Sequence, residues 1–533
     1  MDKQTIKKRI DSLKARPACV IAAGLVVLLL LSAFVIYRLR VIYMPEWLSQ
    51  LQGTRVLFVS LSVLSGLFLL VSKMKSGKEA LSLSFLLLIL GILWTFATPP
   101  NQVPDEQTHY LRRHAMAQGQ WGFDRDHVYP DDVNSFIRHF PEAHNNGYPA
   151  KVGNTMYNRF LEYREAVKNS EKADNTGIII FQVVPYIPAA AGVFIARLAG
   201  LDALGAFYGA RLGNVIFFVA CAFFALRMAE KYRMLLFMLM AMPLSSFVWA
   251  SANSDSFLFA LMALMFASVL AEEFDTKRFV LFIITLGILS TCKMSYIVFL
   301  LLLLCTDRSK WNVGTKNRKM SRLVALALGI AVFRIMYMGM GAYVRTFSNY
   351  GAIPRTIEGT NMSEQLMFVL KNPLRYRAVF WDTLKNNSFF LFSGGILGWL
   401  DVKLLFINLA TPFVALAVCF DQAPKYIWES GRKTAVFLVC SILTYAVVMT
   451  GLYLSWTPVS LPQIIGLQMR YFIPAFMGMF MAVSVWLSGR VNRENDPNDA
   501  FCAGLIYGLN IIAIMMMLRV YYIPLINAVA TAP

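Results

Sequence analysis

The stretch LSLSFLLLILGILWTF, residues 81–96, decides the fold class of this chain. It carries no charge and approaches the roughly 20 residues that an α-helix needs to cross about 30 Å of hydrocarbon. Uncharged runs of similar length occupy residues 22–36 and 56–71. Backbone amides in lipid must be satisfied within their own segment, which an α-helix achieves. We therefore expect an all-α fold, that of a polytopic transmembrane helical protein.

The overall composition supports this fold class. Hydrophobic residues make up 57% of the 533 residues and charged residues only 15%, a balance that soluble domains do not have. The formal net charge of +19 would suggest nucleic acid as the partner of a soluble protein, but here the Lys and Arg residues are concentrated in particular loops. We expect membrane lipids and no nucleic acid as partners. The seven cysteines lie in or beside apolar segments without paired ligand spacing, so neither a disulfide framework nor a zinc site is expected.

The basic loops set the expected topology. Six Lys and Arg residues precede the first apolar run, which lacks a small-residue cleavage site and is interpreted as a retained signal anchor with a cytoplasmic N-terminus. The segment 178–227 holds two apolar stretches but requires an odd number of crossings. We expect the first stretch, with Pro185 and Pro188, to be re-entrant or membrane-parallel; the alternative is that the basic cluster 227–233 breaks the rule. This gives about 13 transmembrane helices with the C-terminus outside.

Five segments follow from this topology. They are the N-terminal cytoplasmic tail with the first three transmembrane helices (1–98), a first large extracytoplasmic loop (99–177), a transmembrane core (178–340), a second large extracytoplasmic loop (341–400) and the C-terminal transmembrane helices (401–533). Within the first loop, 108–118 and 156–168 have a helical pattern. We expect such pieces to be short amphipathic helices on the membrane surface.

The hexapeptide PDEQTH, residues 104–109, opens the first loop directly behind the third span. A helix starting behind Pro104 would place Asp105 and His109 on one face, with Glu106 beside them. A carboxylate near the first helical N–H groups stays ionised near neutral pH and can act as a general base. The alternative is that Asp105 only caps the helix and that Glu106 is solvated.

A second polar cluster, SANSD at 251–255, follows the span from about 234 to 250. The span starts at a basic, cytoplasmic cluster, so Asn253 and Asp255 should emerge on the same side as Asp105 and could orient a substrate there. The alternative is a helix cap, because Ser254 and Asp255 are typical N-cap residues for the next span.

Two cations complete the candidate site. Lys293 interrupts the apolar run 279–304, which is too long for one comfortable crossing and is expected to form two short helices that meet near the outer face. A buried ammonium there needs an anion, and a lipid phosphate is the obvious one; the alternatives are snorkelling or a carboxylate partner. Arg470 lies where an outer loop re-enters the membrane, and its planar guanidinium suits phosphate or carboxylate, although it could be only a helix-end anchor.

Aromatic and polar groups on the same side could contact a sugar or a lipid headgroup. The candidates are Tyr471, Trp399 and Asp401. Clustered carboxylates attract hard cations, which admits Mg²⁺ or Mn²⁺, but no metal spacing fixes a site. No cofactor is certain.

Several motifs together resemble a known family. PDE-x-x-H at 104–109, SANSD at 251–255, CKMSY at 292–296, GWLD at 398–401 and QMRYFIP at 468–474 resemble, in this order, a family of bacterial polytopic membrane proteins of formerly unknown function that is grouped with the GT-C glycosyltransferases. The resemblance covers about 80–500. One departure is Met469, where the family pattern has a glycine, which argues against a backbone contact by that turn.

The resemblance implies a GT-C-like fold and an inverting glycosyltransferase in the bacterial inner membrane, with its active site facing the periplasm or the exterior. The enzyme would move a sugar from a polyprenyl-phosphate donor to a cell-surface glycan or glycolipid. The role of activating the acceptor falls on Asp105 or Glu106. Related GT-C enzymes also carry an acidic residue at a second external turn, here Asp255. Lys293 and Arg470 would hold the donor phosphate.

Two other classes of function remain open. A flippase or transporter for a lipid-linked sugar needs polar groups along a continuous path, whereas the charges within apolar runs gather near one face. A polysaccharide polymerase or ligase also has a large external loop but typically relies on arginines there, and this loop begins with acids.

Overall fold

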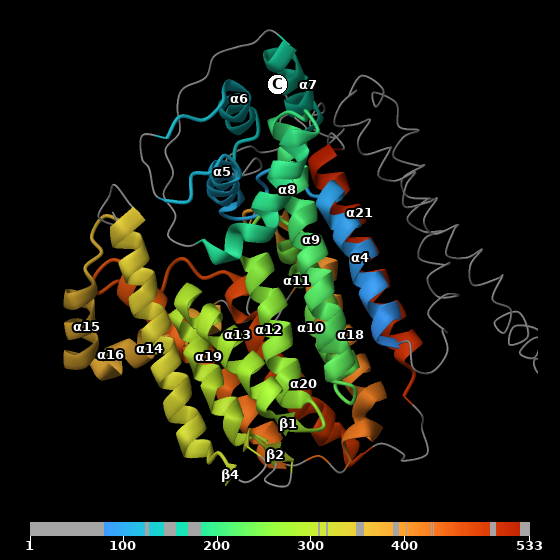
Figure 1. The fold of residues 1–533 in the computed structure, drawn as a ribbon, viewed down its shortest axis with the longest axis vertical. Helices are drawn as coiled ribbons and strands as arrows, with labels where there is room; N and C mark the ends of the chain where they lie inside the picture. The colour runs from blue at the N-terminus through green and yellow to red at the C-terminus, as the bar shows by residue number, and fades with distance from the viewer. Residues whose placement is uncertain are drawn as a thin grey trace, which may run out of the picture.

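The computed structural model describes residues 79–122, 127–142, 156–168, 183–306, 310–315, 318–347, 357–386, 394–400, 402–427, 429, 431–490 and 497–522. These residues form a bundle of helices drawn with its long axis vertical in Figure 1. The all-α expectation is confirmed. The cytoplasmic tail and the first two expected spans lie outside the described residues, as does Asp401.

Seven of the described helices are long and apolar enough to cross a membrane. This confirms a multi-pass membrane protein, because each helix satisfies its own backbone amides over a predominantly apolar stretch of at least 18 residues. The seven helices are α4 (Glu79–Ala97), α9 (Ala203–Met228), α14 (Arg322–Phe347), α18 (Leu405–Gln422) continued by η4 (Ala423–Tyr426), α19 (Gly431–Ser455), α20 (Ile473–Ser488) preceded by η5 (Met469–Phe472), and α21 (Asp499–Tyr522).

Shorter or broken apolar helices run between the same two ends of the bundle. α10 (Arg233–Ala241) is followed by α11 (Pro243–Trp249), and Pro243 explains the break because it has no N–H to continue the helix. α12 (Asp255–Leu270) and α13 (Thr276–Cys292) follow, and then the 3₁₀ helix η3 (Met294–Leu304).

The run 279–304 breaks at Lys293, as expected. Lys293 has extended backbone angles, φ −138° and ψ 105°, between α13 and η3. At the other end, β1 (Phe274–Asp275) precedes α13 and pairs in parallel with β2 (Trp311–Asn312), which follows η3. Because their far ends are tied together, α13 and η3 form a hairpin with Lys293 at its apex.

The two apolar stretches of segment 178–227 differ in length. After η2 (Val184–Tyr186), α8 (Ile187–Leu198) extends only about 18 Å at 1.5 Å per residue, too short to cross the hydrocarbon. It packs backbone to backbone on α9, since a Cβ at Gly192 would lie 2.0 Å from the Gly209 carbonyl oxygen. The short α8 is consistent with a re-entrant first stretch, and α9 is long and apolar enough to be the crossing.

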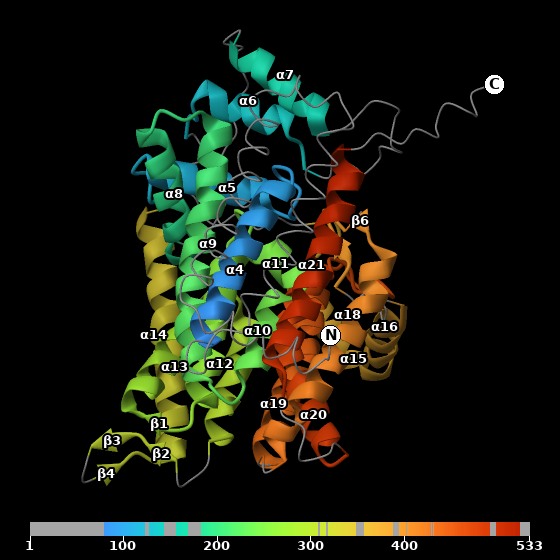
Figure 2. The same cartoon turned by 90° about the vertical axis from the view of Figure 1, so that its right-hand side faces the viewer.

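One end of the bundle carries the helices of the first large loop. These are α5 (Glu106–Ala117), α6 (Asp131–His139) and α7 (Met156–Lys168), which lie at the top of the bundle in Figure 2. We call this the α5 end. The opposite end, the β2 end, carries β1, β2 and the antiparallel pair β3 (Gly314–Thr315) and β4 (Arg318–Lys319). The helical pieces expected at 108–118 and 156–168 are confirmed as α5 and α7.

The described part of the second expected loop contains α15 (Met362–Lys371) and α16 (Pro373–Asn386). Both lie beside the bundle, lower than α5 in Figure 1, and pack on the end of α19 and the segment behind it, where the Tyr376 hydroxyl lies 2.7 Å from that of Thr450. An antiparallel pair, β5 (Ile396–Leu397) and β6 (Val402–Lys403), leads into α18.

Candidate functional site

Four charged residues from four separate elements meet at the α5 end of the bundle. Asp105 precedes α5, Asp255 begins α12, Lys293 joins α13 to η3, and Arg470 lies in η5. The Lys293 ammonium donates to Asp255 Oδ1 at 2.5 Å, and Arg470 Nη1 lies 3.3 Å from Asp255 Oδ2. Arg470 Nη2 donates to Asp105 Oδ2. We call these four residues the ion-pair cluster; in it each carboxylate lies next to a cation.

The two carboxylate-bearing turns are fastened to each other through one backbone carbonyl. The Pro104 carbonyl oxygen accepts hydrogen bonds from Arg470 Nη1 at 3.0 Å and from the Asn253 side-chain amide at 2.7 Å. The other side-chain atom of Asn253, Oδ1, accepts from the Asp255 N–H at 3.0 Å. Asn253 therefore positions both carboxylate-bearing turns through hydrogen bonds to their backbones.

Asp105 has an unusual backbone for a residue with a side chain. Its φ of 66° and ψ of 5° place it in the left-handed region, which typically costs about 1–3 kcal/mol. It occupies the N-cap position of α5 without a side-chain capping hydrogen bond, so its carboxylate is directed to Arg470 instead. The alternative that Asp105 serves only as a cap is therefore not favoured, and Asp255 likewise pairs with cations.

The ion-pair cluster is open on one side. The side chains of Asp105 and Lys293 are 36% and 29% exposed, whereas those of Asp255 and Arg470 are 3% and 5% exposed. Burial would raise the pKa of Asp105, but the Arg470 guanidinium, helped by neighbouring groups, brings the pKa below its usual value. Asp105 is thus an ionised, reachable carboxylate at neutral pH.

His109 lies one helical turn beyond Asp105, as the i, i+4 spacing predicts. Its Nδ1 is 2.7 Å from the Tyr186 hydroxyl. Burial, together with the charge of the nearby Arg113, lowers the pKa of His109 to about 3. The imidazole is therefore neutral at physiological pH. It can form hydrogen bonds, but it has no positive charge with which to bind a phosphate.

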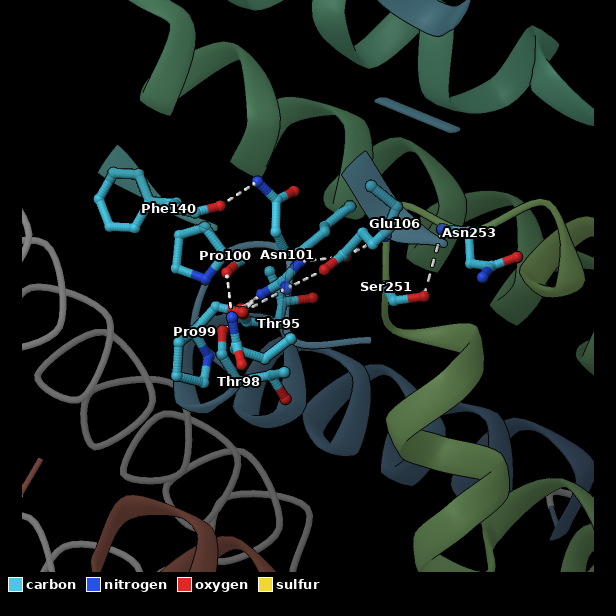
Figure 3. Close-up of polar contacts among 12 residues, drawn as sticks. Thr95, Thr98, Pro99, Pro100, Asn101, Glu106, Phe140, Ser251 and Asn253 are labelled. Carbon is cyan, nitrogen blue, oxygen red and sulfur yellow. Dashed lines mark hydrogen bonds and ion pairs between the residues drawn. The ribbon is translucent and has the colours of Figure 1, made fainter. Parts of the chain in front are cut away.

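Glu106 belongs to a second cluster. Its side chain is fully buried and accepts from Arg211 Nε at 2.9 Å, Arg211 Nη2 at 2.8 Å and the Ala252 N–H at 2.7 Å. The remaining Arg211 donors go to backbone carbonyls that gather at the end of α4 in Figure 3, those of Thr95, Thr98 and Pro99. We call Glu106 and Arg211 the closed pair, since its donors and acceptors are used inside the protein.

Sequence reasoning did not single out Arg211 or Tyr186. A signal for Arg211 existed, because it is one charged residue inside the long apolar stretch that forms α9. A charge within a membrane helix needs a partner, and Glu106 was the available buried acid. Tyr186 carried no such signal, since an aromatic residue beside two prolines is common at a membrane interface.

Of the two expected aromatic groups, Tyr471 lies against the ion-pair cluster and Trp399 contacts the loop that precedes Asp105. The Tyr471 ring centre is 4.9 Å from the Lys293 ammonium nitrogen and 5.3 Å from Arg470 Cζ, which is cation–π geometry. Trp399 donates from its indole N–H to the Asn101 carbonyl oxygen at 3.0 Å, and the Asn101 amide in turn donates to the Phe140 carbonyl oxygen at 2.8 Å (Figure 3). Trp399 thus fastens the loop that presents Asp105.

An apolar cavity of about 240 Å³ is lined in part by residues that are near Arg470 in the sequence. Met469 and Ile473 line it, one residue before and three residues after Arg470. The cavity continues between α10, α18 and α20, where its lining includes Met242, Leu416, Phe480 and Val483.

The carboxylate oxygens of the site suit the protein's own Lys and Arg side chains better than a metal ion. Both carboxylates of the ion-pair cluster are paired with Lys293 or Arg470. In the ranges that the structure describes, no group of three or more His, Cys, Asp or Glu could hold a metal ion.

Fold and site together define a multi-pass α-helical membrane protein with a buried, partly open group of charges at one end. Its residues 88–479 match the family described as "Predicted membrane protein (DUF2142)", so the chain belongs to that family. The matched stretch includes Asp105, Asp255, Lys293 and Arg470. No curated protein and no solved structure matches this chain.

Proposed function

We propose that this protein is an inverting glycosyltransferase of the GT-C class, which moves a sugar from a polyprenyl-phosphate donor to a hydroxyl of an extracytoplasmic glycan or glycolipid. The observation that carries the proposal is the ion-pair cluster. It combines an ionised, exposed carboxylate with two cations at one end of a membrane bundle. Such a group can bind a lipid phosphate and accept a proton at the same place.

The proposed membrane is the bacterial inner membrane, with the α5 end outside the cytoplasm. Basic residues at the loops of the β2 end support this orientation. Lys231 and Lys433 both pair with Glu429 there, and Lys425 pairs with Asp499. About 13 crossings result when the seven long helices are combined with α10–α11, α12, α13, η3 and the two apolar runs that precede the described residues.

Two cysteine variants test this orientation. Gln118 is exposed at the α5 end and Glu273 is exposed at the β2 end. In intact cells, a membrane-impermeant thiol reagent should label Gln118→Cys and should label Glu273→Cys only after the membrane is opened. The seven native cysteines require the unsubstituted chain as a background control. Labelling of Gln118→Cys only from the cytoplasm would overturn the proposed function.

The cations and the apolar cavity suit the two parts of the donor. Lys293 and Arg470 would bind the phosphate, since each can form charge-assisted hydrogen bonds that are stronger than neutral ones. The prenyl chain would follow the apolar cavity from Met469 and Ile473 between α18 and α20. Asp255 would keep the two cations in place between substrates through its contacts with both.

In the reaction, the acceptor hydroxyl oxygen forms a bond to the anomeric carbon on the face opposite the phosphate, which inverts the configuration. The bond between the anomeric carbon and the phosphate oxygen breaks, and its electron pair leaves on the polyprenyl phosphate. Asp105 takes the hydroxyl proton. A carboxylate is a weak base, but the hydroxyl becomes acidic as its oxygen bonds to the electron-poor carbon, so a weak base suffices. Lys293 and Arg470 stabilise the departing phosphate.

Asp105 is the proposed base, and Glu106 is proposed to hold it in position. Glu106 is fully buried in the closed pair and has no exposed oxygen for a substrate. His109 and Asn253 would orient Asp105 or the acceptor, while Tyr471 and Trp399 would border the sugar.

A transfer assay with purified protein in lipid nanodiscs tests the proposal. Polyprenyl-phosphate sugar and membrane-derived glycan acceptors should yield glycosylated acceptor and free polyprenyl phosphate. A flippase would leave the sugar–phosphate bond intact, and a polymerase would require a pyrophosphate-linked donor. Asp105→Asn should slow product formation about 10²- to 10⁴-fold, whereas the matched control Glu273→Gln, at an exposed acid of the β2 end, should not. Sugar transfer that needs a pyrophosphate-linked donor, or no bond cleavage at all, would contradict the proposal.

A further inference from the structure

Among the residues that the structure describes, Arg113 is a fully buried arginine without a hydrogen-bond partner. Its side chain has 0% exposure, and none of its three guanidinium nitrogens is hydrogen-bonded within the described residues. Its neighbour Arg112 donates to the backbone carbonyls of residues 120–122, and Arg211 donates to Glu106 and three carbonyls. Arg113 therefore differs from other buried arginines that hold the same region together.

The position of Arg113 connects it to the proposed site. His109 and Arg113 are four residues apart and so share one face of α5, and Asp105 lies one turn before His109 at the N-cap. The Arg113 guanidinium carbon lies 5.1 Å from the centre of the Tyr186 ring, whose hydroxyl is 2.7 Å from His109 Nδ1. The charges that act on His109 include those of Arg113, Asp105, Asp255 and Arg470. Arg113 and the ion-pair cluster thus lie around the same imidazole.

Burial does not remove the charge of Arg113. Burial lowers the pKa of Arg113 to about 10, with nearby Tyr186 and Glu106 acting in the opposite direction, so the guanidinium remains protonated at neutral pH. A buried cation without an anion is unfavourable, because transfer from water costs several kcal/mol unless a partner repays it. Glu106 is an acid whose charge acts on Arg113, but its carboxylate already pairs with Arg211. The unmet requirement of Arg113 is an anionic oxygen.

The balance of charges indicates what kind of anion fits. The ion-pair cluster contains two cations and two carboxylates, and the closed pair is neutral. Arg113 adds one positive charge in excess around the neutral His109. A phosphate that links a prenyl chain to a sugar is a diester with one negative charge, whereas a pyrophosphate diester carries about two. The single excess charge suits the phosphodiester.

We propose that Arg113 is a third substrate-binding cation, which receives an anionic oxygen of the donor phosphate together with Lys293 and Arg470. The proposal rests on the proposed function and adds a residue and a charge requirement to it. The same guanidinium chemistry would accept the carboxylate of an acidic sugar, which is the other source of an anionic oxygen. Because the Tyr186 ring covers the guanidinium, the ring must move aside when the anion binds.

The test compares two neighbouring arginines on α5. Arg113→Met keeps an extended apolar stem against Tyr186 but removes the charge, and Arg113→Lys keeps the charge. The matched control is Arg112→Met, which removes hydrogen bonds to the backbone carbonyls of residues 120–122 and an interaction with Tyr343. The full-length protein in nanodiscs is titrated with a polyprenyl phosphate, with the corresponding polyprenol as the neutral reference, and its unfolding temperature is followed without ligand.

Arg113→Met should weaken binding of the polyprenyl phosphate about 10- to 100-fold without changing that of the polyprenol, since one charge-assisted contact is lost. Without ligand it should unfold at the same temperature as the natural chain or a higher one, because an unpaired buried charge has been removed. Arg113→Lys should retain part of the affinity. Arg112→Met should show the reverse, with a lower unfolding temperature and unchanged affinity. An Arg113→Met protein that is destabilised or unfolded, while Arg113→Lys is stable and binds polyprenyl phosphate as tightly as the natural chain, would overturn the proposal and make Arg113 a structural cation.

The outcomes separate this proposal from the proposed function. If the natural chain does not distinguish polyprenyl phosphate from polyprenol, the proposed function itself is wrong. If it does, and Arg113→Met binds polyprenyl phosphate equally well, only the role of Arg113 is overturned. A parallel titration with glucuronic acid distinguishes the source of the anion. Loss of glucuronate binding in Arg113→Met, with unchanged polyprenyl-phosphate binding, would also overturn the assignment to the donor phosphate.

Discussion

Asp105 and Glu106 are adjacent acids with opposite surroundings. Glu106 lies in the closed pair, where both of its oxygens and the Arg211 donors are hydrogen-bonded inside the protein. Asp105 belongs to the ion-pair cluster, where its carboxylate is 36% exposed and shares Arg470 with Asp255. Both acids are paired with an arginine. The difference is that only the ion-pair cluster has an exposed acid and an exposed cation to offer a substrate.

The comparison teaches how to separate a structural charge from a candidate catalytic one. A buried ion pair is stable only when its hydrogen-bonding capacity is met, and the closed pair meets it by fastening α4, α5, α9 and the Ala252 turn together. The ion-pair cluster sits directly on this support. Asp105 can keep a strained left-handed backbone because the residues on both sides of it are fixed, Pro104 by Asn253 and Arg470, and Glu106 by Arg211.

The largest effect is expected for Asp105→Asn. The amide keeps the shape and most hydrogen bonds but cannot take the acceptor proton, so turnover in the nanodisc transfer assay should fall about 10²- to 10⁴-fold. The unfolding temperature should stay close to that of the natural chain, because the side chain is partly exposed. Near-normal transfer would show that the catalytic base is another residue, with Asp255 as the next candidate.

Glu106→Gln should act on stability instead. It leaves Arg211 buried without its anion, which typically costs about 3–5 kcal/mol, so the unfolding temperature in detergent should fall sharply. Adding Arg211→Met should recover much of the loss, since the stranded charge is removed. A stable Glu106→Gln protein that binds donor but transfers no sugar would reverse the roles assigned to the two acids.

Lys293→Met and Arg470→Met should differ in their effects on donor affinity and on stability. Lys293 is 29% exposed and bonds only Asp255 among the described groups of the cluster, so its loss should raise the donor KM about 10- to 100-fold with a small change in stability. Arg470 also holds Pro104 and Asp105, so its loss should lower both donor affinity and the unfolding temperature. Normal donor kinetics in both variants would reduce the two cations to structural anchors.

The smallest effect is expected from pH. The pKa of Asp105 is depressed, chiefly by the Arg470 guanidinium, so its carboxylate stays ionised as the pH falls and takes up a proton only below the usual range for an aspartate. His109, with a pKa of about 3, stays neutral over the same range. The kcat/KM for transfer should therefore show no titration of the base between about pH 5 and pH 8. An ionisation near pH 6.5 that disappears in His109→Gln would instead assign the base to the histidine.

The sequence by itself determined the elements whose causes are local. Apolar length predicted the spanning helices, the break at Lys293 followed from a charge inside a run too long for one crossing, and Pro104 with the i, i+4 spacing predicted α5 and the shared face of Asp105 and His109. It also singled out the four residues of the ion-pair cluster, because charges at the ends of membrane segments are costly and therefore few.

Only the tertiary structure decided which charges pair with which. Arg211 and Arg470 lie more than 100 and more than 360 positions from the acids they hold, and no local pattern states that Glu106 takes the first and Asp105 the second. The left-handed backbone of Asp105 and the unpaired burial of Arg113 arise in the same way. A side chain's partner and exposure depend on how distant helices pack, whereas the sequence pattern fixes only the face of the helix from which the side chain starts.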